Sequence, residues 1–413
     1  MTVQCSNCGA LHWMVEKRSD SSLIHPIFGR CCQRGKVSLP PMRIPPEPLY
    51  SLLSMQLDFD PNYILPAIQH ECSRNYLNNI QKYNAAFAFL SLGVKIDERI
   101  TGAGGGPYAF RIHGQLSHLH GALLPEAGHD ISYAQMYIHD TQEALAHAHQ
   151  QRVARNQGTT PEIMLELQDM MHANNPYIPM YRTAHEILLA LPVAQRNVEC
   201  RIHLDESADQ RHYNLPQADQ IAAILPGDGE NATHGRDIVL RLWQGENGLQ
   251  RIYEDSPTYT PLLYVLLFPY GETGFRRGNH SMVSYTRFWA YRLHNRMLPA
   301  HGAHPAQMEP TTIFRSGRLS HQLIVDVWAC VEQLNLCWIR QNQATIRSEL
   351  YGGLVDAMNG NQNANAAALG QQIILPSSHI GSPRHMMQLY QDTMAAARFY
   401  GPATYFITVT ANP

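Results

Sequence analysis

The sequence predicts an α+β fold in several layers, with a small zinc-binding module at the N-terminus and a mainly helical C-terminal third that ends in a strand. The chain has 413 residues, 44% of them hydrophobic and 16% charged, which is enough to bury the cores of two or three domains. Patterns typical of helices and of strands occur in blocks and not in regular alternation, which favours α+β over a parallel α/β sheet. Four of the eight cysteines lie within the first 32 residues, which sets this segment apart.

Residues 1–45 form the predicted cysteine-rich module, which is closed by a proline-rich linker up to residue 48. The candidate ligands of one structural zinc ion are its four cysteines, Cys5, Cys8, Cys31 and Cys32. A Cys-x-x-Cys turn places both sulfurs on one side of a tetrahedral zinc ion, about 2.3 Å from the metal. The second pair is adjacent, which is less usual, so His12 or His25 is an alternative to one of its cysteines. A segment this poor in apolar residues needs the metal to fold, and the opposing interpretation is a frayed terminus with free thiols.

A mixed α/β region is predicted for residues 49–280. Apolar residues at near-helical spacing predict a helix over 75–92, and alternation predicts strands over 108–112 and 132–138. Asp140 is expected to cap the helix that follows the second strand.

The same region contains one more predicted helix, over 160–172, and two more predicted strands, over 198–204 and 237–243. The glycine-rich segment 101–107 is interpreted as a turn, because it lacks the Lys-Ser/Thr pair of a phosphate-binding loop and ends in proline. No ATP site is therefore expected.

Residues 281–413 are predicted to be mainly helical. Apolar residues recur at three- and four-residue spacing over 323–338, which predicts one long amphipathic helix. A second helix is expected around 384–400, and a strand over 405–410.

Aromatic residues and arginines are interleaved between residues 285 and 296. The candidate DNA-binding residues are Arg287, Trp289, Arg292 and Arg296. On a helix, Arg292 and Arg296 share a face with Trp289 close by, which would allow phosphate binding together with base stacking. Residues 271–350 hold nine arginines against five acidic residues, although the whole chain has a net charge of −3. The alternative is an ordinary amphipathic helix, with its aromatics in the core and its arginines in solvent.

Signals for catalysis or for a membrane are weak. Two histidine–apolar–histidine pairs, at 118–120 and 147–149, have no evident third ligand, so no catalytic metal is expected and the chain is not expected to be an enzyme. The longest apolar run, 261–269, is too short to span a bilayer. The N-terminus lacks the basic and apolar regions of a signal peptide, so a soluble intracellular protein is expected.

Several sequence blocks resemble the helicase-like N-terminal region of Helitron transposon proteins. They lie at residues 31–40, 83–89, 110–115, 123–125, 261–272, 317–326, 340–343, 375–384, 389–392 and 406–413. The resemblance implies a nuclear protein of rolling-circle transposition whose partner is DNA, as single strands or transposon ends. In this family a nuclease and an ATP-dependent helicase follow, and the nuclease opens with a strand like 406–410. The chain is therefore expected to be a catalytically incomplete piece; Ala411 stands where the family usually has cysteine.

These observations leave three functional hypotheses. The leading one is the N-terminal region of a Helitron-type protein that binds DNA with the help of a zinc module. The second is an interaction or structural module without DNA affinity of its own, which the near-neutral charge favours. The third is a free-standing metal-dependent nuclease, which would require His118 or His147 to hold a catalytic ion.

Overall fold

The computed structural model describes residues 3–53, 67–92, 95–96, 112–113, 118–120, 122–125, 128–192, 199–204, 221–227, 238–240, 250–252, 256–272, 274–275, 283–298, 307–309, 311–343, 346, 373–401 and 405. The chain divides into two compact units, Met1–Val327 and Trp328–Pro413, and each is described by itself. Among the described helices, none combines the length and the apolar character that crossing a bilayer requires.

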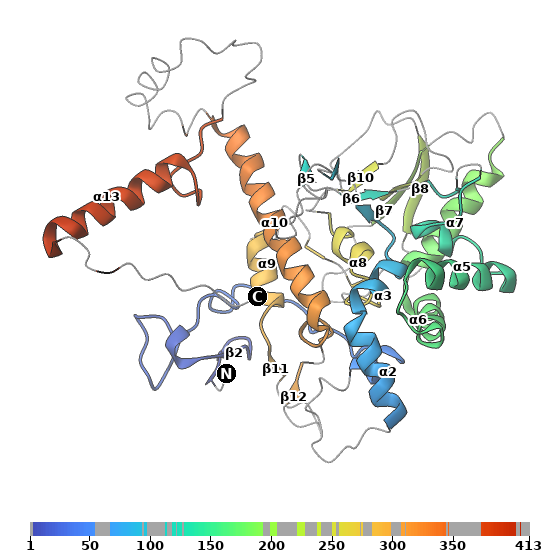
Figure 1. Ribbon diagram of the computed structural model, residues 1–413, viewed down its shortest axis with the longest axis horizontal. Coiled ribbons are helices and arrows are strands. Elements are labelled where there is room, and N and C mark those ends of the chain that lie inside the picture. Colours follow the sequence, from blue (N-terminus) through green and yellow to red (C-terminus); the bar gives the residue numbers. More distant parts are fainter. Residues whose placement is uncertain are drawn as a thin grey trace, which may run out of the picture. The chain divides into compact units, whose positions relative to one another are not determined.

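The described part is helix-rich with small antiparallel sheets (Figure 1). The α-helices are α1 (Leu49–Leu53), α2 (Ala67–Asn78), α3 (Ile80–Phe87), α5 (Gln142–Arg155), α6 (Pro161–Asn174), α7 (Tyr177–Ala190), α8 (Tyr259–Leu263), α9 (Tyr285–Arg292), α10 (Gly317–Gln341) and α13 (Pro383–Tyr400). The 3-10 helices are η1 (Met14–Glu16), η3 (Tyr133–Tyr137) and η6 (Ile313–Arg315).

The described strands form five sheets of two or three members each. Their bounds are β1 (Val3–Gln4), β2 (Leu11–His12), β3 (Ser91–Leu92), β4 (Lys95–Ile96), β5 (Ile112–His113), β6 (His118–His120), β7 (Glu199–Leu204), β8 (Ile221–Gly227), β9 (Ile238–Leu240), β10 (Gln250–Ile252), β11 (Met297–Leu298) and β12 (Gln307–Met308). The pairs are β1–β2, β4–β5 and β11–β12, and β6 and β7 are the central strands of the three-stranded sheets. The order in which these elements stack into layers stays a prediction.

A helical region made of α3, η3, α5, α6 and α7 holds an aromatic core in the first unit. The ring of Phe89 stacks on Tyr137 at a centroid distance of 4.6 Å and tilts against Tyr181 at 5.0 Å. The hydroxyl of Tyr137 donates to the carbonyl of Phe87 at 2.7 Å. Arg152 of α5 is fully buried beside these rings, with its guanidinium over Phe87 and over Tyr137 at 4.9 and 4.8 Å.

The segment 256–272 is almost wholly buried and joins the helical region through α3. Asn84 connects the two, because its side-chain amide donates to the carbonyl of Leu263 at 2.9 Å and accepts from the backbone N–H of Leu266 at 3.2 Å. The N–H of Phe89 also donates to the carbonyl of Leu262 at 2.9 Å. These bonds satisfy backbone groups that the end of α8 would otherwise leave without a partner.

Several predicted elements are confirmed. The helix predicted over 160–172 is α6, the amphipathic helix over 323–338 lies within α10, and the helix around 384–400 is α13. The strands predicted over 198–204 and 237–243 are β7 and the shorter β9. The predicted turn at 101–107, residues 108–111 of one predicted strand and residues 406–410 of the last lie outside the described residues.

Three predictions about local structure were wrong. The strand expected over 132–138 is the 3-10 helix η3, because the Gln135 side chain accepts from the N–H of Ser132 at 2.9 Å and closes a capping box that overrides the alternating pattern. The helix expected over 75–92 is interrupted between α2 and α3 and ends at Phe87. The N-cap of α5 is Thr141, whose hydroxyl accepts from the N–H of Ala144, while Asp140 forms an ion pair with Arg182 at 3.2 Å.

Candidate metal centre

The first cysteine pair lies on the turn between β1 and β2, which pair with Val3 opposite His12 and Gln4 opposite Leu11. Backbone bonds close this turn, from the N–H of Cys5 to the carbonyl of Ala10 at 2.8 Å and from the N–H of Gly9 to the carbonyl of Cys5 at 2.9 Å. Gly9 has a φ of +69°, a conformation that favours glycine, and a Cβ there would collide with the carbonyl oxygen of Met297. The turn thereby fixes Cys5 and Cys8 on one side of the strand pair.

The second pair, Cys31 and Cys32, begins a tight turn over 31–36. The N–H of Gly35 donates to the sulfur of Cys32 at 3.3 Å, and the N–H of Val37 donates to the Cys32 carbonyl at 3.0 Å. Gly35 itself has a φ of +82°. A backbone N–H directed at sulfur stabilises a thiolate, so the turn prepares Cys32 for metal ligation.

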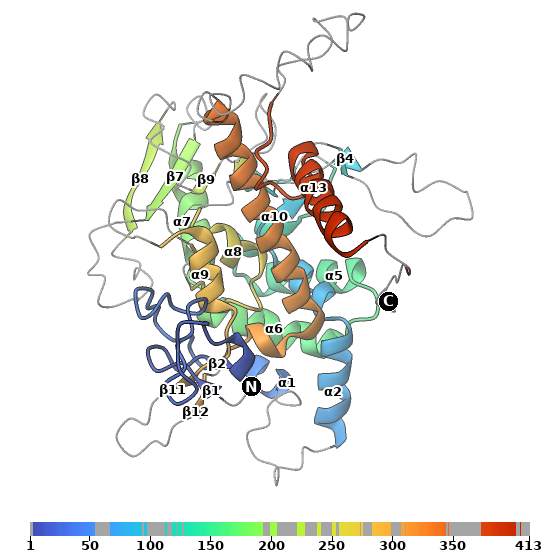
Figure 2. The same cartoon turned by 90° about the vertical axis from the view of Figure 1, so that its left-hand side faces the viewer.

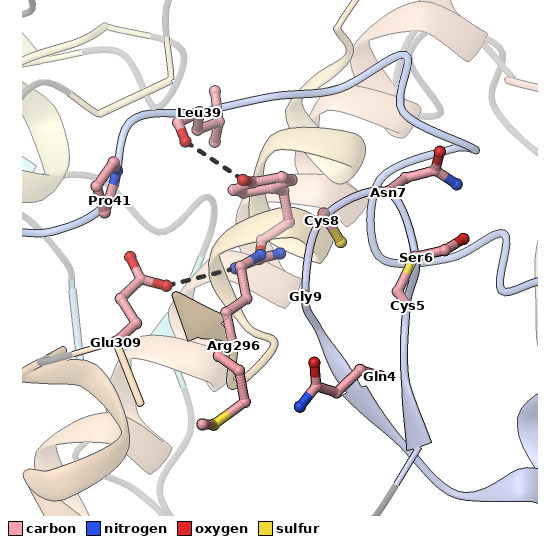
Figure 3. Close-up of a pocket in the computed structure, with 12 residues that line it drawn as sticks. Gln4, Cys5, Ser6, Asn7, Cys8, Gly9, Leu39, Pro41, Arg296 and Glu309 are labelled. Atoms are coloured by element: carbon pink, nitrogen blue, oxygen red, sulfur yellow. Dashed lines mark hydrogen bonds and ion pairs between the residues drawn. The ribbon is translucent and has the colours of Figure 1, made fainter. Parts of the chain in front are cut away.

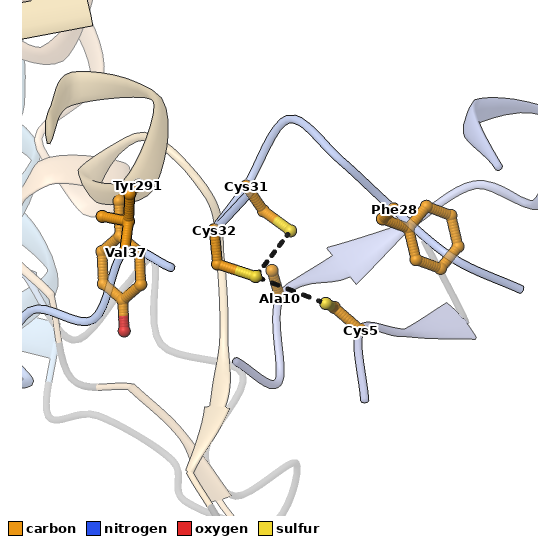
Figure 4. Close-up of a cluster of buried hydrophobic side chains, with 7 residues drawn as sticks. All are labelled: Cys5, Ala10, Phe28, Cys31, Cys32, Val37 and Tyr291. Carbon is orange, nitrogen blue, oxygen red and sulfur yellow. Dashed lines mark hydrogen bonds between the residues drawn. The ribbon is translucent and has the colours of Figure 1, made fainter. Parts of the chain in front are cut away.

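The four cysteine sulfurs converge within 4.8 Å of one another, as the prediction from spacing required. The sulfur of Cys32 lies 3.8 Å from those of both Cys5 and Cys31 (Figure 4). Tetrahedral zinc with bonds of about 2.3 Å separates its sulfur ligands by about 3.8 Å, so the spacing fits this ion. The arrangement is a possible metal site with four thiol ligands.

The electrostatics of the cluster also favour a cation. Hydrogen bonds from Cys31 and Cys8 lower the pKa of Cys5, whereas the contact with Cys5 raises the pKa of Cys31. Burial raises the pKa of Cys32 to about 11. One thiolate therefore suppresses ionisation of its neighbours, and a divalent cation at the centre would remove that repulsion and hold all four as thiolates.

The histidine alternatives to Cys32 have other surroundings. His12 is buried, its Nδ1 lies 2.9 Å from a carboxylate oxygen of Glu16, and its ring stacks on Phe28 at 4.1 Å. His25 is exposed, and its backbone N–H binds the hydroxyl of Ser22 at 2.9 Å. Among the described residues, the four cysteines form the group of side chains close enough to share an ion.

The cysteine module, residues 3–45, pairs through its backbone with the segment after α9. The sequence analysis did not predict this contact. The N–H of Leu11 donates to the carbonyl of Asn295 at 2.8 Å, and the N–H of Met297 donates to the carbonyl of Gly9 at 3.0 Å. Ala10 and Arg296 form an antiparallel bridge, which places β1 and β2 beside β11 and β12 (Figure 2). Tyr291 joins the buried cluster of Cys5, Ala10, Phe28, Cys31, Cys32 and Val37.

The linker before residue 48 is bound along the same surface. The hydroxyl of Tyr291 donates to the carbonyl of Leu39 at 3.3 Å, and Arg292 donates to the carbonyl of Pro40 at 2.8 Å. The N–H of Met42 donates to a carboxylate oxygen of Glu309 at 2.9 Å. The linker carbonyls of Leu39 and Pro40 are therefore satisfied by side chains of α9, and the extended conformation of the linker stays a prediction.

Trp289, Arg292 and Arg296, three of the candidate DNA-binding residues, are buried or bonded within the fold. Trp289 is only 2% exposed, Arg292 binds the linker, and Arg296 is 4% exposed with its guanidinium on the ring of Tyr291. Arg287 is exposed on the first turn of α9. The aromatics lie in the core, as the alternative interpretation expected, and the role of these residues in DNA binding stays a prediction.

The histidine pairs lie on different elements. His118 and His120 are the ends of β6, and their side chains are outside the description. His147 and His149 lie on α5, and Nε2 of His149 is 2.9 Å from the carbonyl oxygen of Pro161. In the described part of the chain, neither His147 nor His149 belongs to a group that could share a metal ion.

Comparison with known families identifies the C-terminal part of the chain. Residues 294–413 match the model of the Helitron helicase-like domain at N-terminus. This part is therefore a Helitron helicase-like N-terminal region, as the sequence blocks had suggested. The match begins at the segment that pairs with the cysteine module. A search of curated proteins gave no match.

Proposed function

We propose that this chain is a DNA-binding, architectural region of a Helitron-type transposition protein, with a structural zinc ion in its cysteine module. The observation that carries the proposal is the four-cysteine cluster, joined by backbone hydrogen bonds to the start of the Helitron-like segment. The partner is DNA, as single strands or transposon ends, and the location is nuclear. Both follow from the Helitron resemblance.

The charge of the module supports a nucleic-acid partner. Residues 1–48 contain six lysines and arginines against three acidic residues, an excess of three positive charges in a chain whose net charge is −3. Arg30, Arg34 and Lys36 are exposed around the second cysteine turn, and Trp13 is 54% exposed beyond β2. Exposed cations and an exposed aromatic ring on one module are the combination that binds single strands.

The chain alone is proposed to be catalytically incomplete. The zinc ion would hold the cysteine turns in place, and four thiolate ligands would leave no open coordination position for water or substrate. A nicking assay with supercoiled DNA and a divalent ion tests this directly. Cutting that is lost when one of the chain's own tyrosines is changed to phenylalanine would overturn it.

The DNA-binding proposal is tested by fluorescence anisotropy with a labelled single strand over a salt series. Each phosphate contact of a single strand contributes about 0.7 to the slope of log affinity against log salt. The double variant R30A/R34A is expected to weaken binding and to reduce this slope by about 1 to 2. The pair R74A/R155A, two exposed arginines on α2 and at the end of α5, is the matched control. No binding by the wild type at low salt removes the proposal.

A second candidate function is an interaction module without DNA affinity. The intramolecular engagement of Trp289, Arg292 and Arg296 favours it, because these side chains are occupied inside the fold. It predicts that a longer protein containing the nuclease and helicase regions binds DNA, whereas this chain does not.

A further inference from the structure

A pocket of about 430 Å³ lies where the cysteine module meets the segment after α9. Its rim is the 4–9 turn that carries Cys5 and Cys8, and Leu39, Pro41 and Met297 provide apolar walls (Figure 3). Arg296 and Glu309 also line it, and both are almost fully buried, at 4% and 5% exposure. Its volume is in the range of sites for small ligands.

The two charged residues retain unused hydrogen-bonding capacity. In the described part of the chain, Nε of Arg296 is buried without an acceptor, although its terminal nitrogens donate to the carbonyls of His294 and Tyr291. One carboxylate oxygen of Glu309 accepts from Met42, and the other lies 3.8 Å from Arg296, beyond hydrogen-bond distance. Buried polar groups left without partners are unfavourable, so a ligand that supplied them would be bound.

The charges identify the kind of ligand. Arg296 and Glu309 neutralise each other, and a phosphate would be repelled by the carboxylate, so the pocket suits a neutral molecule with both donors and acceptors. Apolar walls suit a flat ring. An unpaired nucleobase has these properties, and single-stranded bases are commonly recognised by their exposed edges in such pockets.

We propose that this pocket binds one unpaired nucleobase of a DNA strand, and guanine in preference to the others. Guanine presents two adjacent N–H donors, which a carboxylate such as Glu309 accepts together, and a carbonyl oxygen for the N–H of Arg296. Thymine, cytosine and adenine each place an acceptor where the second donor is needed. The inference rests on the proposed DNA binding and specifies which part of the strand the module recognises.

The test compares two labelled strands of about ten nucleotides, one all thymine and one with a single central guanine, on the zinc-loaded full chain. A bidentate contact to a base discriminates by roughly tenfold, so the guanine strand is expected to bind about tenfold more tightly. Glu309→Gln is expected to abolish this preference, so that the two strands bind with equal affinity. Glu166→Gln, at an exposed position of α6, is the matched control and should keep the preference.

A second variant protects the test against misfolding. Leu39→Trp adds bulk at the pocket wall and is expected to reduce the guanine preference without altering the Arg296–Glu309 pair, and Leu165→Trp on the exposed face of α6 is its control. The metal content of each variant shows whether it keeps the module intact. If Glu309→Gln loses metal, the guanine preference of Leu39→Trp is used to test the proposal instead. Equal binding of both strands by the wild type overturns the pocket proposal alone. Absence of any strand binding at low salt overturns the DNA-binding proposal as well.

Discussion

The cysteine module and the helical region bury charge by opposite means. The module gathers four thiols, and the contact with Cys5 raises the pKa of Cys31. The helical region buries the cation of Arg152, which the described structure surrounds with two aromatic rings, the carbonyl of Ala86 and the amide oxygen of Gln168. With the proposed zinc ion bound, the module takes its counter-charge from an ion outside the chain, whereas the helical region supplies its own from dipoles and ring faces.

The largest expected effect is the loss of metal. Chelation, or Cys31→Ser, is expected to unfold residues 3–45, because these residues have few apolar contacts apart from the thiol cluster. Hydrogen exchange should show lost protection there and at 295–297, and retained protection in α5–α7. The control is Cys337→Ser, at a cysteine outside the cluster. Full protection of the module after metal removal would contradict the metal requirement.

A smaller effect is expected from removing the buried cation of the helical region. Arg152→Ala leaves a cavity between Phe87 and Tyr137 and deprives Ala86 and Gln168 of a donor, so it is expected to lower the free energy of unfolding by about 3–5 kcal/mol. Chemical denaturation measures the change. Arg155→Ala, exposed one turn later, should stay within about 0.5 kcal/mol of the wild type. Equal effects of the two variants would show that the cation is not held by its surroundings.

A pH effect should follow from His172, which lies in the same cation-rich region. Burial, together with the charges of Arg182 and Arg152, lowers the pKa of His172 to about 4. The unfolded chain, with a histidine pKa of about 6.5, binds more protons between these values, so stability falls as pH drops from about 6.5 to about 4. Because the side chain is only partly buried, solvent screening limits the loss to about 1–2 kcal/mol.

The variant His172→Gln isolates this effect from acid release of metal by the module. Its stability should fall less steeply than that of the wild type over the same pH range. His147→Gln, at an exposed position of α5, is the control and should keep the wild-type slope. If the free energy of unfolding depends on pH in the same way for His172→Gln and the wild type, His172 is not neutral and buried.

The smallest effect concerns the entry to α5, which carries Arg152. Thr141→Ala removes the hydroxyl that accepts from the N–H of Ala144, and is expected to destabilise the helical region by about 1 kcal/mol. Thr141→Ser should restore most of this difference because it keeps the oxygen. Calorimetry of the two variants checks the prediction, and equal stability would show that the cap contributes nothing.

Local chemistry in the sequence predicted much of both regions. The Cys-x-x-Cys spacing and the second cysteine pair identified the cluster, because a tetrahedral ion imposes strict geometry on few residues. Apolar periodicity predicted α6, α10 and α13, whose faces repeat over several turns. Short elements were predicted less well: in η3, one side-chain bond between Gln135 and Ser132 decides the conformation.

The junction between the module and α9 could not be predicted, because its bonds join residues about 290 positions apart and are made by backbone atoms. The arginines after α9 illustrate the difficulty. Arg292 and Arg296 have the composition of a nucleic-acid site, yet they bind the linker and Glu309, which adjacency in the sequence does not reveal. Whether an arginine is free or engaged depends on the chain segment that folds over it.

In the second unit, Gln343 pairs with Ile374 through two hydrogen bonds, its amide nitrogen donating to the carbonyl at 3.0 Å and its amide oxygen accepting from the N–H at 2.9 Å. The side chain of Gln343 thus joins two positions that lie 31 residues apart in the sequence. The entropic cost of closing a loop grows only slowly with the length of the loop. Insertions and deletions between residues 343 and 374 should therefore be tolerated as long as Gln343 is kept.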